Sequence, residues 1–232
     1  MAFFRPPEGA ELRETLTRAF PLFGALAVLI VGLWGFGVLV EDLLTGDPIV
    51  QIDRALAAWL HDHASSVLTP ILVAVTTLGS AWVLAPLAVV AVALLLRRHR
   101  GRDALMVALA IVGAELLTVG LKAGFERERP FFADPLAVEG TFSFPSGHAT
   151  VSLAVYGALA IVMAKSRETL ARRIAVLLAA AALILLIGFS RLYLGVHFLS
   201  DVLAGFSAGL AWLGLCTLAI YARRGWASRA SA

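Results

Sequence analysis

Charged side chains are scarce in this chain, because Asp, Glu, Lys and Arg together make up only 15% of its 232 residues. Soluble domains carry about a quarter charged residues, whereas 60% of this chain is hydrophobic. Cysteine is nearly absent, and the single Cys216 excludes a scaffold held by disulfides. The net charge of +3 is too small to indicate a nucleic-acid partner. These shortages indicate a protein that lies mostly within a lipid bilayer.

Long apolar stretches take the place of the missing charges, and about 20 residues are enough to cross a bilayer. Six membrane-spanning helices are predicted: between Arg18 and Glu41, between His63 and Arg97, from Ala104 to Leu121, from His148 to Lys165, from Ile174 to Ser190, and from Val202 to Ala222. The second stretch is too long for one straight crossing. Its Pro70 and its Gly79-Ser80 pair indicate a lead-in segment before the crossing. The expected fold is an all-α integral membrane bundle of six transmembrane helices, in one domain over residues 1–232.

Two further segments are interpreted from their patterns. Ile52, Leu56, Trp59 and Leu60 recur at helical spacing, which is typical of an interfacial helix, although an ordinary loop helix packed on the bundle fits as well. The first apolar run is longer than the apolar core of a cleaved signal peptide, and acidic residues precede it. We expect a first helix that is retained in the protein.

The distribution of Lys and Arg predicts the orientation in the membrane, because short cytoplasmic loops carry an excess of these residues. Six crossings place both termini on one side, which then holds 14 of the 19 basic residues. The opposite side holds five: Arg54, Lys122, Arg127, Arg129 and Arg191. The first side is therefore expected to be the cytoplasm, and the five exceptions need another reason to lie outside.

Three of these exceptions, Lys122, Arg129 and Arg191, are fixed positions of unusual strings at the outer ends of predicted crossings. The strings are Lys122-x6-Arg129-Pro130, Pro145-Ser146-Gly147-His148, and Ser190-Arg191-x5-His197-x3-Asp201. Together they describe a site for a cluster of anionic oxygens, because guanidinium groups donate forked hydrogen bonds that match phosphate. Ser146 and Gly147 stand where a helix is predicted to start, and the free backbone N–H groups of a helix start also bind anions.

The histidines supply the reactive groups of this site. His197 and Asp201 are four residues apart, so they share one face of a helix, and the carboxylate can fix the tautomer of the imidazole. The other ring nitrogen is then free to act as a nucleophile. His148 is a second imidazole on the same membrane face and is suited to proton transfer near neutral pH.

Other polar residues carry less specific signals. Arg54 and Arg127 are interpreted as interfacial anchors, and His61, His63 and His99 as polar residues near helix ends. Glu115 lies within a predicted crossing, two helical turns before Lys122. We expect it to face the bundle interior, where it supports the cations or makes a buried polar contact of its own.

The three strings resemble the tripartite signature of the type 2 phosphatidic acid phosphatase (PAP2) superfamily, with every signature position matched in order between Lys122 and Asp201. The resemblance implies a PAP2-like bundle and hydrolysis through a phosphohistidine, without a metal or other cofactor. It implies His197 as the nucleophile, Asp201 as its partner and His148 as the acid and base. It assigns the phosphoryl oxygens to Lys122, Arg129, Ser146, Gly147, Ser190 and Arg191.

The leading hypothesis is a multi-pass phosphatase of the cell (inner) membrane, with cytoplasmic termini and an extracytoplasmic active site. Its substrate would be a membrane lipid phosphate or diphosphate, such as undecaprenyl diphosphate, phosphatidic acid or phosphatidylglycerol phosphate. Transfer of the phosphoryl group to a second acceptor is one alternative. A non-catalytic transporter or scaffold on the same fold is another, but such a protein would be expected to have lost a catalytic residue. The signature names neither the lipid nor the oligomeric state.

Overall fold

The computed structural model describes residues 9–46 and 48–229, and this part of the chain forms eight α-helices and no strand. The helices are α1 (Gly9–Thr45), α2 (Pro48–Asp62), α3 (Leu68–Thr77), α4 (Ala81–Arg97), α5 (Gly101–Phe125), α6 (Gly147–Lys165), α7 (Leu170–Tyr193) and α8 (Leu199–Arg229). The all-α prediction is therefore confirmed.

Five segments are long and apolar enough to cross a membrane: Pro21–Thr45 of α1, α5, α6, α7 and Leu199–Tyr221 of α8. The short helix α3 and the helix α4 meet this test together, with a bend of 41° between them. The chain breaks at Leu78–Ser80, where the Gly79-Ser80 pair predicts the end of a lead-in segment. Counted as one bent crossing, this pair completes the six predicted spans.

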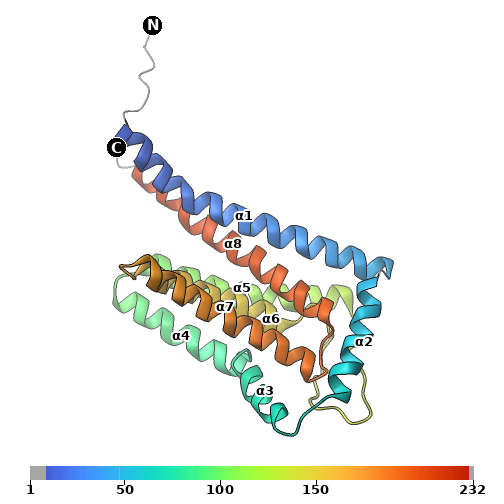
Figure 1. The fold of residues 1–232 in the computed structure, drawn as a ribbon. Coiled ribbons are helices and arrows are strands. Elements are labelled where there is room, and N and C mark those ends of the chain that lie inside the picture. The colour runs from blue at the N-terminus through green and yellow to red at the C-terminus, as the bar shows by residue number, and fades with distance from the viewer. Residues whose placement is uncertain (1–8, 47, 230–232) are drawn as a thin grey trace.

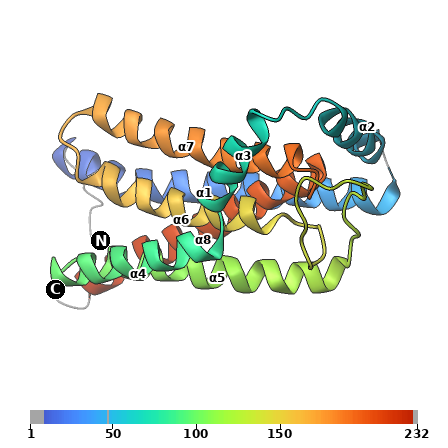
Figure 2. The same ribbon diagram turned by 90° about the horizontal axis from the view of Figure 1, so that it is seen from below.

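The connections separate to the two ends of the bundle. Figure 1 shows the α4–α5 and α6–α7 connections at the end where α1 begins and α8 ends. The helix α2, the α5–α6 loop and the α7–α8 turn lie at the opposite end, where α2 runs across the direction of the spans (Figures 1 and 2). This short amphipathic helix packs on α1, α7 and α8, which fits both the interfacial helix and the packed loop helix expected at residues 52–60.

The helix α6 lies at the centre of the bundle and is the most buried of the five segments. It packs against α5, α7 and α8. Gly205 and Gly209 of α8 allow a close approach, because a Cβ at Gly205 would lie 2.6 Å from the carbonyl oxygen of Ser146. The start of α8 is thereby held directly against the start of α6.

Candidate active site

The three strings converge at the end of the bundle that carries α2. Lys122 is in the last turn of α5, Arg191 in the last turn of α7, and Asp201 in the first turn of α8. The backbone N–H of Ser146, the N-cap of α6, donates to the carbonyl oxygen of Asp201 at 2.9 Å. Arg129 of the α5–α6 loop reaches the ring of His197 at 3.1 Å. Side chains separated by 79 positions in the sequence thus surround one small region.

His197 is held between a carboxylate and a guanidinium. Its Nδ1 lies 3.4 Å from Oδ2 of Asp201, and its Nε2 lies 3.1 Å from the Arg129 guanidinium. Arg129 can only donate, so Nε2 accepts and Nδ1 carries the proton toward Asp201. Burial lowers the pKa of His197 to about 4, despite the opposing hydrogen bond and charge of Asp201. The ring is therefore neutral at physiological pH, with a lone pair on Nε2.

The three predicted cations are all held by one short stretch of the α5–α6 loop. Arg191 is paired with Glu139, and Lys122 donates to the carbonyl oxygen of Phe142. Arg129 donates to the Thr141 carbonyl at 2.5 Å and to the Phe142 carbonyl at 3.2 Å. Residues 139–142 thus present a carboxylate and two carbonyl oxygens to the cations. The cations therefore already donate to anionic and polar oxygens.

Burial and ion pairing shift the pKa values of Arg129 and Glu139 in this cluster. Burial lowers the pKa of Arg129 below its ordinary value, although the nearby Glu139 and Asp201 carboxylates oppose this shift. Burial raises the pKa of Glu139, but the charge and hydrogen bond of Arg191 outweigh burial and hold it below its ordinary value. Arg191 keeps its Nε buried without a hydrogen-bond partner, so one donor of the fork is unused.

Of the two free helix-start donors that the sequence predicts, Ser146 differs from the expectation. The N–H of Ser146 is engaged by Asp201, whereas its buried hydroxyl has no partner. A Cβ at Gly147 would lie 4.0 Å from Cε of Lys122, so the first helical residue of α6 is beside that cation. The buried Ser190 hydroxyl donates to the carbonyl of Ile187 at 2.6 Å and is directed back along its own helix.

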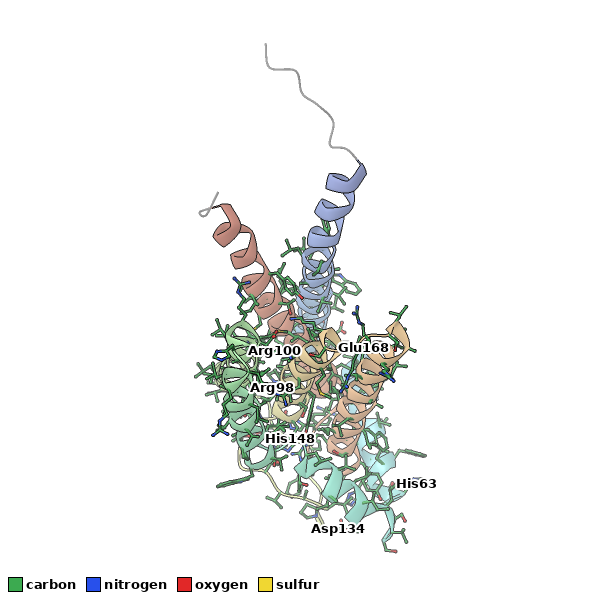
Figure 3. All side chains as sticks on the ribbon, turned by 90° about the vertical axis from the view of Figure 1, so that its left-hand side faces the viewer. His63, Arg98, Arg100, Asp134, His148 and Glu168 are labelled. Carbon is green, nitrogen blue, oxygen red and sulfur yellow. The ribbon has the colours of Figure 1, made fainter. Side chains whose placement is uncertain are left out.

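His148 enters the region from the first turn of α6, and Figure 3 places it within the projected bundle when the molecule is viewed from the α4–α5 end. A Cβ at Gly79, in the bend between α3 and α4, would lie 3.1 Å from Cδ2 of His148. Among the described residues, no hydrogen bond restrains the imidazole of His148. Its surroundings thus differ from those of His197, which has a partner on each nitrogen.

Arg127 is the residue that the sequence interpretation places wrongly. It is not an interfacial anchor, because its side chain is only 11% exposed and forms ion pairs with Asp53 and Asp201. Asp53 comes from α2 and also accepts a hydrogen bond from the Ser200 backbone N–H at 2.9 Å. Neither contact has a local sequence signal, because the partners of Arg127 lie 74 positions away in either direction.

The other polar residues singled out in the sequence lie outside this cluster. His61 contacts Asp134, and His63 donates to the carbonyl of Trp59. Glu115 lines an apolar groove between α4 and α5, so its side chain is not directed at the cations. No group of three His, Cys, Asp or Glu side chains within residues 9–46 and 48–229 could hold a metal ion.

Two cavities flank Arg129 and lead to the cluster. One of about 630 Å³ lies between α2 and residues 127–132 and is lined by Arg54 and Phe198. The other, of about 610 Å³, lies between the end of α5 and residues 139–142 and is lined by Lys122. Both cavities are lined by Arg129, which contacts His197, whereas His197 lines neither of them.

Comparison with known proteins matches the part of the chain that contains the three strings. The family model of the PAP2 superfamily matches residues 103–225. Phosphatidylglycerophosphatase B of Bacillus subtilis is 40% identical over 181 residues, which are 78% of this chain and 89% of that protein. A crystal structure of the Bacillus subtilis transmembrane PAP2-type phosphatidylglycerolphosphate phosphatase has a TM-score of 0.71 and 30% identity, covering 88% of this chain and 96% of that one. Lipid A 1-phosphatase of Rhizobium etli is 33% identical over 124 residues, 50% of this chain and 49% of that protein.

Proposed function

Since the chain belongs to the PAP2 superfamily and is a membrane-bound lipid phosphatase, we propose that it cleaves its substrate through a phosphohistidine on His197, at the extracytoplasmic face. The observation that carries this proposal is the placement of His197 between Asp201 and Arg129. A neutral imidazole with its Nδ1 proton directed at a carboxylate presents the Nε2 lone pair as a nucleophile.

In the first step, Nε2 of His197 attacks phosphorus, and the bond between phosphorus and the lipid oxygen breaks. His148 donates a proton to that oxygen, so the lipid leaves as an alcohol, or as a monophosphate when the substrate is a diphosphate. Asp201 stabilises the positive charge that develops on the His197 ring. In the second step, His148 takes a proton from water, the water oxygen attacks phosphorus, and inorganic phosphate leaves His197.

Lys122, Arg129 and Arg191 provide the charge that binds the phosphoryl oxygens in both steps, because Arg129 contacts Nε2 of His197 and all three cations donate to oxygens of residues 139–142. Gly147 lets an oxygen approach the start of α6 next to Lys122. The unpartnered Ser146 hydroxyl supplies one more donor. For Ser190 we propose a minor contribution, since its hydroxyl already donates to Ile187.

Phosphatidylglycerol phosphate is the first substrate to test, because the relative named for that activity is 40% identical over 78% of this chain and 89% of its own length. The experiment is phosphate release by the purified protein from detergent-dispersed phosphatidylglycerol phosphate, phosphatidic acid and undecaprenyl diphosphate. His197→Ala is the blank. His63→Ala is the matched control, because His63 is exposed and contacts only α2.

The expected result is phosphate release that is lost in His197→Ala and retained in His63→Ala, together with a labelled protein on acid quenching with ³²P-labelled substrate. Activity that survives in His197→Ala would overturn the phosphohistidine. Labelled phosphate that moves to an added alcohol in preference to water would favour phosphoryl transfer.

A further inference from the structure

Arg127 occupies a costly position for a cation that is none of the fixed positions of the three strings. Its guanidinium donates to Oδ1 of Asp201 at 2.5 Å and to Oδ2 of Asp53 at 2.9 Å. Both carboxylate side chains are fully buried. Charges in such surroundings are retained only where good hydrogen bonds compensate for lost hydration. One of the two carboxylates that Arg127 contacts belongs to the partner of His197.

The two oxygens of Asp201 have separate partners. Oδ2 faces Nδ1 of His197 at 3.4 Å and accepts from the Phe198 backbone N–H at 2.9 Å. Within residues 9–46 and 48–229, Oδ1 accepts from Arg127 alone. A carboxylate held at both oxygens cannot turn freely about its Cβ–Cγ bond, so Arg127 and the Phe198 N–H together set the plane in which the carboxylate meets the imidazole. The long distance to His197 leaves little tolerance for such rotation.

Arg127 is in turn held by Asp53 of the helix α2. Asp53 of α2 accepts from Arg127 and from the backbone N–H and hydroxyl of Ser200, the residue that precedes Asp201. The Arg127 guanidinium also donates to that hydroxyl at 2.7 Å. Asp53 therefore holds both the cation that orients Asp201 and the backbone that carries Asp201.

We propose that Arg127 of the α5–α6 loop and Asp53 of α2 are positioning residues, which hold the Asp201 carboxylate in place against His197. This inference rests on the proposed phosphohistidine chemistry. Neither residue contacts Lys122, Arg129 or Arg191, so the capture of phosphate is independent of them. The step that depends on them is the formation of the phosphohistidine.

The expected effect of removing the Asp53 charge is thus on rate and not on binding. Asp53→Asn should slow phosphoenzyme formation roughly tenfold to a hundredfold, the range typical of groups that orient a catalytic ligand. KM and inhibition by inorganic phosphate should change by less than about threefold, since ground-state binding is retained. Asp62→Asn is the matched control, because it removes the same charge from the exposed end of the same helix.

A double-mutant cycle separates positioning from general stabilisation of the fold. Single-turnover phosphoenzyme formation is measured for Asp53→Asn, for Asp201→Asn and for both together, with thermal unfolding in detergent alongside. The expected result is a strong effect of Asp53→Asn in the native background and almost none when Asp201 is already Asn. An equal factor in both backgrounds, or a rise in KM without a fall in rate, would overturn the proposal.

Arg127→Lys and Arg127→Gln extend the test if Asp53→Asn does not fold. The lysine keeps the charge but cannot bridge two carboxylates with a planar fork. We expect its rate to lie between the native rate and that of Arg127→Gln, and equal rates for the two variants would overturn the proposal. His197→Ala distinguishes the two levels of inference. If His197→Ala stays active, the proposed phosphohistidine mechanism is wrong. If His197→Ala is inactive but the effects of Asp53→Asn and Asp201→Asn are additive, only the positioning role is wrong.

Discussion

His197 and His148 differ in what their rings contact, and this difference assigns them different parts of the reaction. His197 has Asp201 on one nitrogen and Arg129 on the other, whereas no described residue hydrogen-bonds to His148. An oriented ring suits a nucleophile, and a ring free to turn between two oxygens suits proton transfer. Substitutions at the two positions should therefore fail at different steps.

In His148→Ala the rate of phosphoenzyme formation should be reduced much less with p-nitrophenyl phosphate than with a lipid phosphate, because p-nitrophenolate leaves without a proton. Its phosphoenzyme should accumulate, since water then lacks a base, and the loss in turnover should be about 10² to 10⁴-fold. Acid quenching with labelled substrate measures this intermediate. A labelled His197→Ala beside an unlabelled His148→Ala would reverse the two roles.

The buried position of His197 predicts its pH dependence. Burial lowers its pKa from 6.5 to about 4 against the pull of Asp201, so Nε2 stays unprotonated above that pH. Single-turnover phosphoenzyme formation at saturating substrate should hold down to about pH 5 and fall below about pH 4. A rate that already falls steeply near pH 6.5 would show that His197 titrates as an exposed imidazole.

The same shift affects folding stability in a defined window. Between pH 4 and 6.5 the unfolded chain binds a proton at His197 that the folded protein does not. Stability should therefore fall as the pH drops through this window, by at most about 1.4 kcal/mol per pH unit, and this contribution should be constant above it. Thermal unfolding of the native protein and of His197→Ala at pH 7.5 and pH 5 measures the difference, and equal losses would exclude this linkage.

At the scale of elements, the α5–α6 loop and the substrate compete for the same three cations. Glu139 pairs with Arg191, and the carbonyls of Thr141 and Phe142 accept from Arg129 and Lys122. A phosphoryl group needs the same donors, so its binding has to displace at least part of this stretch.

Glu139→Gln should therefore strengthen binding of inorganic phosphate, because it removes the negative charge beside Arg191. We expect the inhibition constant for phosphate to fall about threefold to tenfold, which is the size of one partly exposed charge interaction. Asp134→Asn is the control, as it removes a charge from the same loop away from the cations. A weaker affinity in Glu139→Gln would mean that the carboxylate helps to organise the cations for phosphate.

The contact between α6 and α8 is a second element on which the site depends. A side chain at Gly205 would meet the Ser146 carbonyl and the Cβ of Ala149, so Gly205→Val should force the two helix starts apart. Overpacking of this kind costs about 1–3 kcal/mol, and a displacement near 1 Å can lower the rate about 10²-fold. Gly37→Val of α1 has open space around it and should leave activity and thermal unfolding unchanged.

Sequence alone predicts those parts that have a local pattern. The six apolar runs, the break at Gly79-Ser80 and the amphipathic α2 are visible as composition and spacing, and the fixed spacing of the three strings gives the site residues. Arg127, Asp53 and Glu139 could not be found this way, because their contacts join segments that are 52 or more positions apart. An exposed anchor and a buried ion pair look the same in one sequence until the packing is known.

At the scale of the whole molecule, the described connections divide between two ends with different chemistry. The end with the α4–α5 and α6–α7 connections carries Arg98, Arg100, Lys165 and Arg167 near helix ends. The opposite end carries the candidate active site beneath α2. The positive-inside rule then predicts that the site opens away from the cytoplasm.

Single-cysteine labelling tests this orientation in a Cys216→Ala background. Val138→Cys is suitable because Val138 is 83% exposed on the α5–α6 loop, and Gly101→Cys is suitable because Gly101 starts α5 in open space. An impermeant maleimide should label position 138 in intact cells, and position 101 only after the cells are broken. The opposite pattern would invert the topology and assign the enzyme to the inner leaflet's lipids.

The contacts of residues 139–142 also have a consequence for inhibitor design. In these contacts Lys122, Arg129 and Arg191 donate to one carboxylate and two amide carbonyls, at the positions where we propose that they bind a phosphoryl group. A compound that copies this arrangement, with a single acid and neighbouring amides, would carry less charge than a phosphate mimic. Such a scaffold is a starting point for an inhibitor that the protein's own contacts supply.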